Sequence, residues 1–237
     1  FDALGHITSA YTICSNSTYN CAGGPTPWGT WLTCEETDLG RVIEGNPRGI
    51  NPPQVRNALG WFDHEAAAID SNTGFVYLTE DRTDGRLYRF RPAVTGNLGA
   101  GILEVAQLSG AGPWTVNWLG VPNANPTGSQ TRTRRQVKRS TAFDGGEGAW
   151  YHNGVVYITT KGDNRVWALE TGTNRMRVIY DDNSSTNPIL TGVDNVTVSQ
   201  TGSIYVGEDG GDMQICVIGP AGDVAPLLKV ENQTASE

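Results

Sequence analysis

The sequence has few of the residues from which the commonest zinc and nucleophile sites are built. It contains three histidines, and none stands in an HxH or HExxH spacing, so a histidine-based zinc site is unsupported. It contains no GxSxG nucleophile elbow, and no GxGxxG sequence opens a helix. These absences argue against the common serine-hydrolase and dinucleotide-binding sites.

The chain also lacks a surplus of basic residues and a long apolar run. Its net charge of -8 argues against a nucleic-acid partner, and the basic run from Arg132 to Arg139 is interpreted as a solvated loop. No apolar stretch approaches the roughly 18 to 20 residues of a membrane span, and no signal peptide is recognised. The chain begins with Phe1, so we expect a processed chain or a piece of a longer protein.

Cysteine is scarce as well, with four residues. Cys14 and Cys21 flank a polar hexapeptide, a spacing that is compatible with a small disulfide loop in an oxidising compartment and equally with two unpaired thiols. Cys216 lies in an apolar segment and is expected to be a buried strand residue. Cys34 is different, because two carboxylates follow it directly.

Glycine is abundant, with 30 residues spread between short apolar segments, and one pattern of segments repeats along the chain. Units that start at His64, Gly146 and Val193 each contain an acid, a short strand, a polar turn and further strands, and the segment from Thr30 matches the later part of this unit. Repeated meanders of this length predict an all-β fold, a β-propeller of which this chain supplies about four to five blades.

We expect a single domain over residues 1–237, part of a larger propeller. Residues 101–140 carry a weaker pattern and are interpreted as a degraded blade, with a long inserted loop around 113–140.

Acidic side chains recur at two positions of the repeat, the start of each unit and the end of its second strand. Carboxylates at equivalent positions of successive blades would face one channel, where their repulsion favours bound cations. Calcium prefers such oxygen ligands, whereas a thiolate among them indicates a transition metal. The alternative is a set of solvent-exposed turn residues. The residues at these positions are Glu65, Glu147 and Asp194, then Cys34 with Glu35, Glu80 with Asp81, and Glu208 with Asp209.

The chain resembles the PhoX-type alkaline phosphatase family over nearly its whole length. The resemblance implies a secreted or periplasmic propeller that hydrolyses phosphate monoesters at a site of calcium ions and an oxo-bridged iron pair, with a cysteine thiolate on iron. It also implies that family members extend beyond both ends of this chain. The motifs that carry it are NCAGGPTPWGTWLTCEE, HEAAAID, VYLTEDR, GGEGAW, TKGDNRVW and GVDNVTV with IYVGEDGGD.

The resemblance also assigns roles to particular residues. Cys34 would bind iron, and Glu65 and Glu147 would bind or bridge metals. The further candidates, chiefly for calcium, are Glu35, Glu80, Asp81, Asp194, Glu208, Asp209 and, as the unit-start residue of the first blade, Asn20.

One position departs from the family pattern. Gly145 stands where members of the family carry a phosphate-binding arginine. Lys161 or Arg82 would be the substitute for that arginine, and each has the alternative role of an ordinary turn or ion-pair residue.

Two other functions remain open. A calcium-dependent propeller lactonase or esterase would also gather acids in the channel, but without a thiolate. A non-enzymatic secreted propeller would use its metals structurally.

Overall fold

The computed structural model describes residues 1–233, and in this part of the chain the strands form four antiparallel blades. Each blade has four strands that follow one another in sequence. The first blade contains β1 (Asn20–Pro25), β2 (Trp31–Glu35), β3 (Val42–Gly45) and β4 (Gln54–Val55). The second contains β5 (His64–Ile69), β6 (Val76–Glu80), β7 (Leu87–Val94) and β8 (Asn97–Ser109), followed by an additional strand, β9 (Trp114–Gly120).

The other two blades repeat the same order. The third contains β10 (Gly146–His152), β11 (Val155–Thr160), β12 (Arg165–Glu170) and β13 (Arg175–Asp181). The fourth contains β14 (Val193–Val198), β15 (Ile204–Glu208), β16 (Gln214–Ile218) and β17 (Val224–Lys229). Short helices lie in the connections: η1 (Asn57–Leu59), α1 (Thr133–Gln136) and η2 (Asp182–Ser184).

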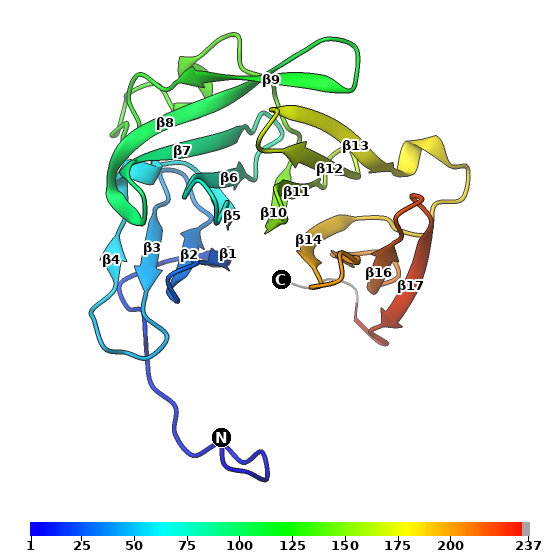
Figure 1. Ribbon diagram of the computed structural model, residues 1–237, viewed down its shortest axis with the longest axis horizontal. Helices are drawn as coiled ribbons and strands as arrows, with labels where there is room; N and C mark the ends of the chain where they lie inside the picture. The colour runs from blue at the N-terminus through cyan, green and yellow to red at the C-terminus, as the bar shows by residue number, and fades with distance from the viewer. Residues whose placement is uncertain (234–237) are drawn as a thin grey trace.

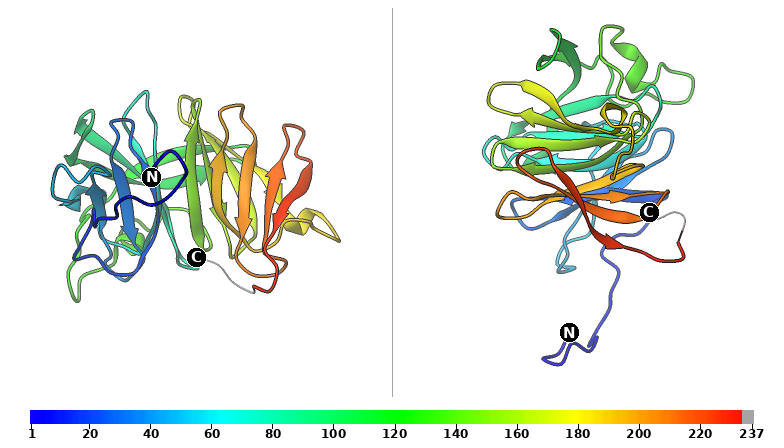
Figure 2. Two further views of the ribbon diagram at one scale, coloured as in Figure 1. Left: turned by 90° about the horizontal axis from the view of Figure 1, so that it is seen from below. Right: turned by 90° about the vertical axis from the view of Figure 1, so that its right-hand side faces the viewer.

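The blades are arranged along an arc with their first strands innermost (Figure 1). The inner strands β1, β5, β10 and β14 contact one another in that order, and the blades stand side by side in the left view of Figure 2. The all-β propeller predicted from the sequence is therefore confirmed, with four blades in the described residues.

The inner strands approach one another closely at glycines. A Cβ atom on Gly24 would lie 1.8 Å from the carbonyl oxygen of Ala67 on the next blade, and one on Gly148 would lie 2.5 Å from the backbone nitrogen of Val196. Only glycine permits such a backbone approach, so these positions allow the inner strands to pack around the centre.

Apolar side chains between the blades form three buried clusters. The first joins blades one and two and includes Leu32, Val42 and Tyr88, and the second joins blades two and three. The third joins blades three and four, with Val166 beside Cys216. The prediction that Cys216 is buried in a strand is confirmed.

The degraded blade expected over residues 101–140 is not a separate blade. The β8 strand extends through Ser109 as the fourth strand of blade two, and β9 pairs with both β8 and β13, so it joins the outer edges of blades two and three. The expected loop is therefore shorter than predicted, because its first residues are strand.

In residues 1–233, the structure contains no helix long and apolar enough to cross a membrane.

Candidate metal centre

A β-bulge interrupts every inner strand directly after its first residue. Pairing is regular at Asn20–Glu35, His64–Glu80, Gly146–Thr160 and Val193–Glu208, and each inner strand then has one extra residue before pairing resumes. A bulge changes the direction of the side chains that it contains. The residues that follow these four starting positions are therefore structurally equivalent, and they are Cys21, Glu65, Glu147 and Asp194.

A second set of equivalent residues follows the second strand of each blade. In each blade, the first residue of the inner strand pairs with a residue on the second strand, and the member of this set is the residue that directly follows that partner. The four members are Glu36, Asp81, Lys161 and Asp209. We call the two sets together the central cluster. Electrostatic interactions link members of both sets across blades, such as Glu65 with Glu36 and Glu147 with Asp81, so the cluster is one site made by all four blades.

The most compact part of the central cluster contains Cys21, Glu36 and Glu65. One ligand atom from each lies within 4.8 Å of the others, and the Cys21 thiol is hydrogen-bonded to the Glu65 carboxyl group. One oxygen of Glu65, Oε1, is buried without a hydrogen-bond partner among the described residues. A buried unpartnered carboxylate oxygen is costly, and a cation would satisfy it.

Burial and mutual repulsion make this site unfavourable for negative charge. Burial, together with the charges of Glu36 and Asp194, raises the pKa of Glu65 to about 8. Burial and the charges of Asp194 and Glu65 raise the pKa of Glu147 to about 9. Burial likewise raises the pKa of Cys21. Such a group of acids ionises readily only when positive charge is bound beside it.

The donor atoms therefore fit bound metal ions. Cys21 offers a soft sulfur ligand, which suits a transition metal, next to two carboxylates. Asp81, Glu147 and Asp194 offer only hard oxygen ligands, which suit calcium.

Cys34 lies elsewhere. It is completely buried in the apolar cluster that contains Leu32 and Val42, and it is not a member of the compact group of Cys21, Glu36 and Glu65. The predicted equivalence of the repeat positions in blade one is wrong by one residue: Cys34 corresponds to Thr79 and Thr159, whereas Glu36 corresponds to Asp81. Because side chains alternate between the two sides of a strand, a displacement of one residue changes which side chains face the blade interior and which face the cluster. Cys34 therefore lies in the interior, and Glu36 lies in the cluster.

The carboxylates at the ends of the second strands also lie outside the central cluster. Glu35 accepts hydrogen bonds from the backbone nitrogens of Thr18 and Arg41 at 3.1 and 3.0 Å and forms an ion pair with the Arg41 side chain. Glu208 accepts from the backbone nitrogens of Thr191 and Gln214 at 2.7 and 2.9 Å. In both blades, one backbone donor lies seventeen residues before the glutamate and the other lies six residues after it. Glu35 and Glu208 are therefore the same structural carboxylate, repeated in two blades.

Glu80 is the corresponding residue of blade two. It accepts hydrogen bonds from the backbone nitrogen of Arg86, the hydroxyl of Tyr88 and the side chain of Arg134.

Asn20 is exposed, and its side-chain amide donates to Thr33, while its neighbour Cys21 occupies the bulge. The structure thus brings together Glu65, Asp81, Glu147, Asp194 and Asp209 of the predicted ligands, but not Cys34, Glu35, Glu80, Glu208 or Asn20.

Two members of the cluster, Cys21 and Glu36, are not among the ligands predicted from the sequence. The signal was present, because NC at the start of β1 parallels HE at β5 and GE at β10. Of the two possibilities for Cys14 and Cys21, a disulfide loop or two unpaired thiols, the structure has the unpaired thiols, since all four cysteines are free.

Two basic residues lie beside the acids. The Lys161 ammonium forms ion pairs with Asp209 and, at 3.5 Å, with Asp194. Although burial opposes it, these partners raise the pKa of Lys161, so the ammonium remains charged. Arg82 follows Asp81 and donates to Asp63 at 2.6 Å.

Gly145 also borders the cluster. Its φ is +63°, and a Cβ atom there would lie 3.5 Å from Oδ1 of Asp81 and 3.7 Å from Cβ of Lys161. A side chain at this position would therefore begin among the acids of the cluster, yet the backbone conformation is one that favours glycine.

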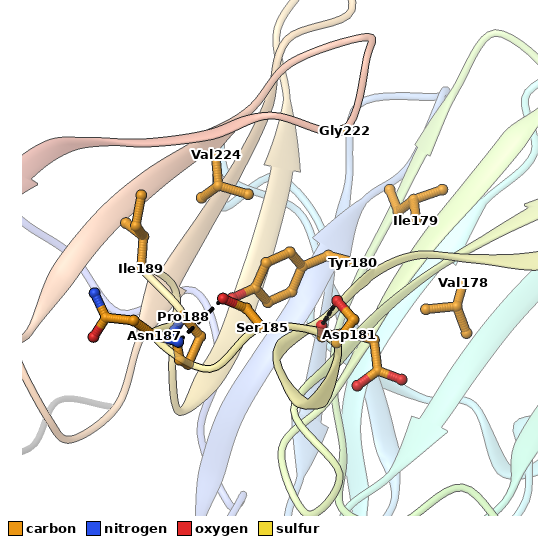
Figure 3. Close-up of a pocket in the computed structure, with 11 residues that line it drawn as sticks. Val178, Ile179, Tyr180, Asp181, Ser185, Asn187, Pro188, Ile189, Gly222 and Val224 are labelled. Atoms are coloured by element: carbon orange, nitrogen blue, oxygen red, sulfur yellow. Dashed lines mark hydrogen bonds between the residues drawn. The ribbon is translucent and has the colours of Figure 1, made fainter.

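A separate cavity of about 430 Å³ lies between the third and fourth blades (Figure 3). Tyr180 projects into the middle of this close-up, with Val178 and Ile179 on one side and Ile189 and Val224 on the other. The tyrosine hydroxyl donates to the carbonyl oxygen of Leu190 at 2.5 Å. None of the lining residues belongs to the central cluster, so this cavity is not part of the metal centre.

Comparisons with known proteins point to one family. The family model described as alkaline phosphatase PhoX matches residues 5–49 and 38–175. No curated protein matches the chain significantly.

Solved structures are similar in fold. PhoX of Pseudomonas fluorescens, in complex with the transition-state analogue vanadate, is 18% identical with a TM-score of 0.70; the match covers 87% of this chain and 60% of that one. Weaker likenesses, each 12% identical over 93% of this chain, are a Bacteroides thetaiotaomicron protein of unknown function (TM-score 0.48, 59% of that chain) and a Xanthomonas campestris gluconolactonase (TM-score 0.43, 79% of that chain). This chain therefore spans about 60% of the length of the Pseudomonas PhoX structure.

Proposed function

This chain belongs to the PhoX alkaline phosphatase family, and from that premise we propose that it is a secreted or periplasmic, metal-dependent hydrolase of phosphate monoesters. The observation that carries the proposal is the equivalence of Cys21, Glu65, Glu147 and Asp194 at four bulges around one centre. The four bulges bring carboxylates that repel one another together at one centre, and bound cations would offset this repulsion.

The central cluster would hold both kinds of metal. Cys21, Glu36 and Glu65 would hold iron, whereas Asp81, Glu147 and Asp194 would hold calcium. When bound, the metals would neutralise the phosphoryl oxygens and stabilise the charge of the transition state.

The residues of the chain have their own tasks in this proposal. Lys161 and Arg82 would bind and orient the phosphoryl group, in place of the arginine that position 145 lacks. Lys161 is ion-paired with Asp209 and Arg82 with Asp63, so these acidic partners would hold both basic side chains in place before the substrate binds. Positioning of the ester in this way lowers the entropic cost of the reaction. Glu147 is buried among acids and would be the catalytic carboxylate of the cluster.

Elemental analysis together with a p-nitrophenyl phosphate assay tests the proposal. We expect iron and calcium in the native protein, and we expect turnover to be lost on chelation and to return when both metals are restored. Turnover by a metal-free sample would overturn the proposal. Calcium without iron, combined with hydrolysis of lactones instead of phosphate esters, would favour the lactonase alternative. Hydrolysis of neither substrate by the metal-loaded protein would favour a non-enzymatic propeller.

A further inference from the structure

Four arginines line a cleft of about 680 Å³. They are Arg82, after β6, and Arg132, Arg134 and Arg135, in and beside α1. This concentration is unexpected in a chain with a net charge of -8. Asp38 is the one acid among the residues that line the cleft.

The cleft is continuous in sequence with the candidate metal ligands. Arg82 directly follows Asp81, and Asp38 lies two residues after Glu36, so the loops that bound the cleft also supply the cluster. The backbone nitrogen of Gly145 donates to the carbonyl oxygen of Arg82 at 3.0 Å, which joins this loop to the third blade beside Lys161. Arg82 thus lines the cleft and also interacts electrostatically with Asp81 of the cluster, so the side chain that would bind the reacting phosphoryl group belongs to the cleft as well.

Two of the arginines are anchors. Arg134 is mostly buried and forms ion pairs with Glu80 at 3.1 Å and Asp84 at 3.0 Å. Arg132 donates to both oxygens of Asp38 and also to the carbonyl oxygens of Gly128 and Gln130. These contacts hold the 128–135 segment against the blades.

The other two arginines have capacity for a ligand. The Arg82 side chain is 46% exposed and donates through one nitrogen to Asp63, and the Arg135 side chain is 64% exposed and donates through Nε to Asp84. A guanidinium carries five N–H donors in a planar fork that matches phosphate and carboxylate groups. Each of these side chains therefore has N–H donors beyond the one that binds its aspartate.

We propose that the arginine cleft binds a second anionic group of the substrate, so that the preferred substrates are phosphomonoesters whose leaving group carries another phosphate. The inference rests on the proposed function for the position of the reacting phosphate. The positive cleft would attract such polyanions toward a site that is itself rich in carboxylates. Arg135 would be a specificity residue, and Arg134 a positioning residue.

The test compares fructose 1,6-bisphosphate with fructose 6-phosphate in the metal-loaded protein. We expect kcat/KM to be higher for the bisphosphate, and we expect Arg135→Ala to lower the bisphosphate-to-monophosphate ratio about tenfold, which corresponds to about 1.4 kcal/mol. Arg177→Ala is the matched control, because it removes one exposed cation from the outer strand of blade three and should leave the ratio unchanged. A ratio that is equal in wild type and Arg135→Ala would overturn the inference.

A binding measurement separates this inference from the proposed function. If the protein hydrolyses no phosphate ester, calorimetry with inorganic pyrophosphate and metal-free protein still reports on the cleft. Weaker binding by Arg135→Ala than by Arg177→Ala, with an affinity that falls as salt rises, supports the cleft even then. Equal binding by the two variants would mean that the arginines only hold the 128–135 segment in place.

Discussion

The Cys21 thiol and the Glu65 carboxyl group occupy the same bulged position on neighbouring inner strands and are hydrogen-bonded to each other. This contact between blades one and two identifies Cys21, and not Cys34, as the thiol of the central cluster.

Two cysteine variants separate these roles. Cys21→Ala should lower iron content and phosphatase turnover at least tenfold, because it removes a ligand atom, while the free energy of unfolding of the metal-free protein changes little. Cys34→Ala should leave metal content intact and lower the free energy of unfolding by about 1 kcal/mol, since it removes a small apolar group from the core. Metal analysis and urea unfolding check both, and iron loss confined to Cys34→Ala would contradict the assignment.

Adjacent glutamates offer a second matched pair. Glu35→Gln should destabilise the fold by about 1–3 kcal/mol, because backbone donors and Arg41 lose a buried charged partner. Glu36→Gln should instead reduce metal content with a smaller effect on stability. Chemical denaturation of metal-free samples, with metal analysis of loaded ones, measures the two effects. Equal metal loss in both variants would argue that Glu35 also binds metal.

The metal-free protein should become less stable as pH rises from about 5 to about 9. Burial raises the pKa of Glu65 to about 8 and that of Glu147 to about 9. In the unfolded chain both groups are already ionised above their ordinary pKa of 4.5, so the folded state binds more protons and loses stability with rising pH. Thermal melts at several pH values measure the slope.

Added metal provides the control for the pH effect. Calcium should raise the melting temperature most at the alkaline end of this range and flatten the slope, because bound cations favour ionised carboxylates. Glu147→Gln should reduce the slope without metal. A melting temperature that does not depend on pH in the metal-free protein would show that these groups ionise normally.

Replacing Gly145 with arginine should not simply restore a phosphate-binding side chain. The substitution places a side chain at φ +63°, with its Cβ atom 3.1 Å from the backbone nitrogen of Gly162, so we expect a loss of about 1–2 kcal/mol in the free energy of unfolding. Gly145→Ala should cost a similar amount, since the strain arises at the backbone and Cβ. Denaturation midpoints of the two variants check this; an arginine variant as stable as wild type would show that the loop adapts.

The sequence alone determined the fold class, the repeat and most of the acids in the cluster. Strand alternation and turn residues are local signals, and they recur in each unit from His64, Gly146 and Val193. The same pattern places Glu65, Glu147 and Asp194 at the starts of the units, and in the structure these three residues lie in the bulges of the inner strands.

Only the tertiary structure decided the register between blades. A one-residue displacement separates Glu35 from Glu36, and Cys21 and Cys34 each lie near the end of a different strand, β1 and β2. No local pattern shows which glutamate or which cysteine belongs to the cluster, because all four are compatible with a strand end. The bulges and the pairing of β1 with β2 direct Cys21 and Glu36 to the centre and leave Cys34 and Glu35 in the blade. Which side chains meet was decided by contacts between strands more than forty residues apart, such as those between β1 and β5.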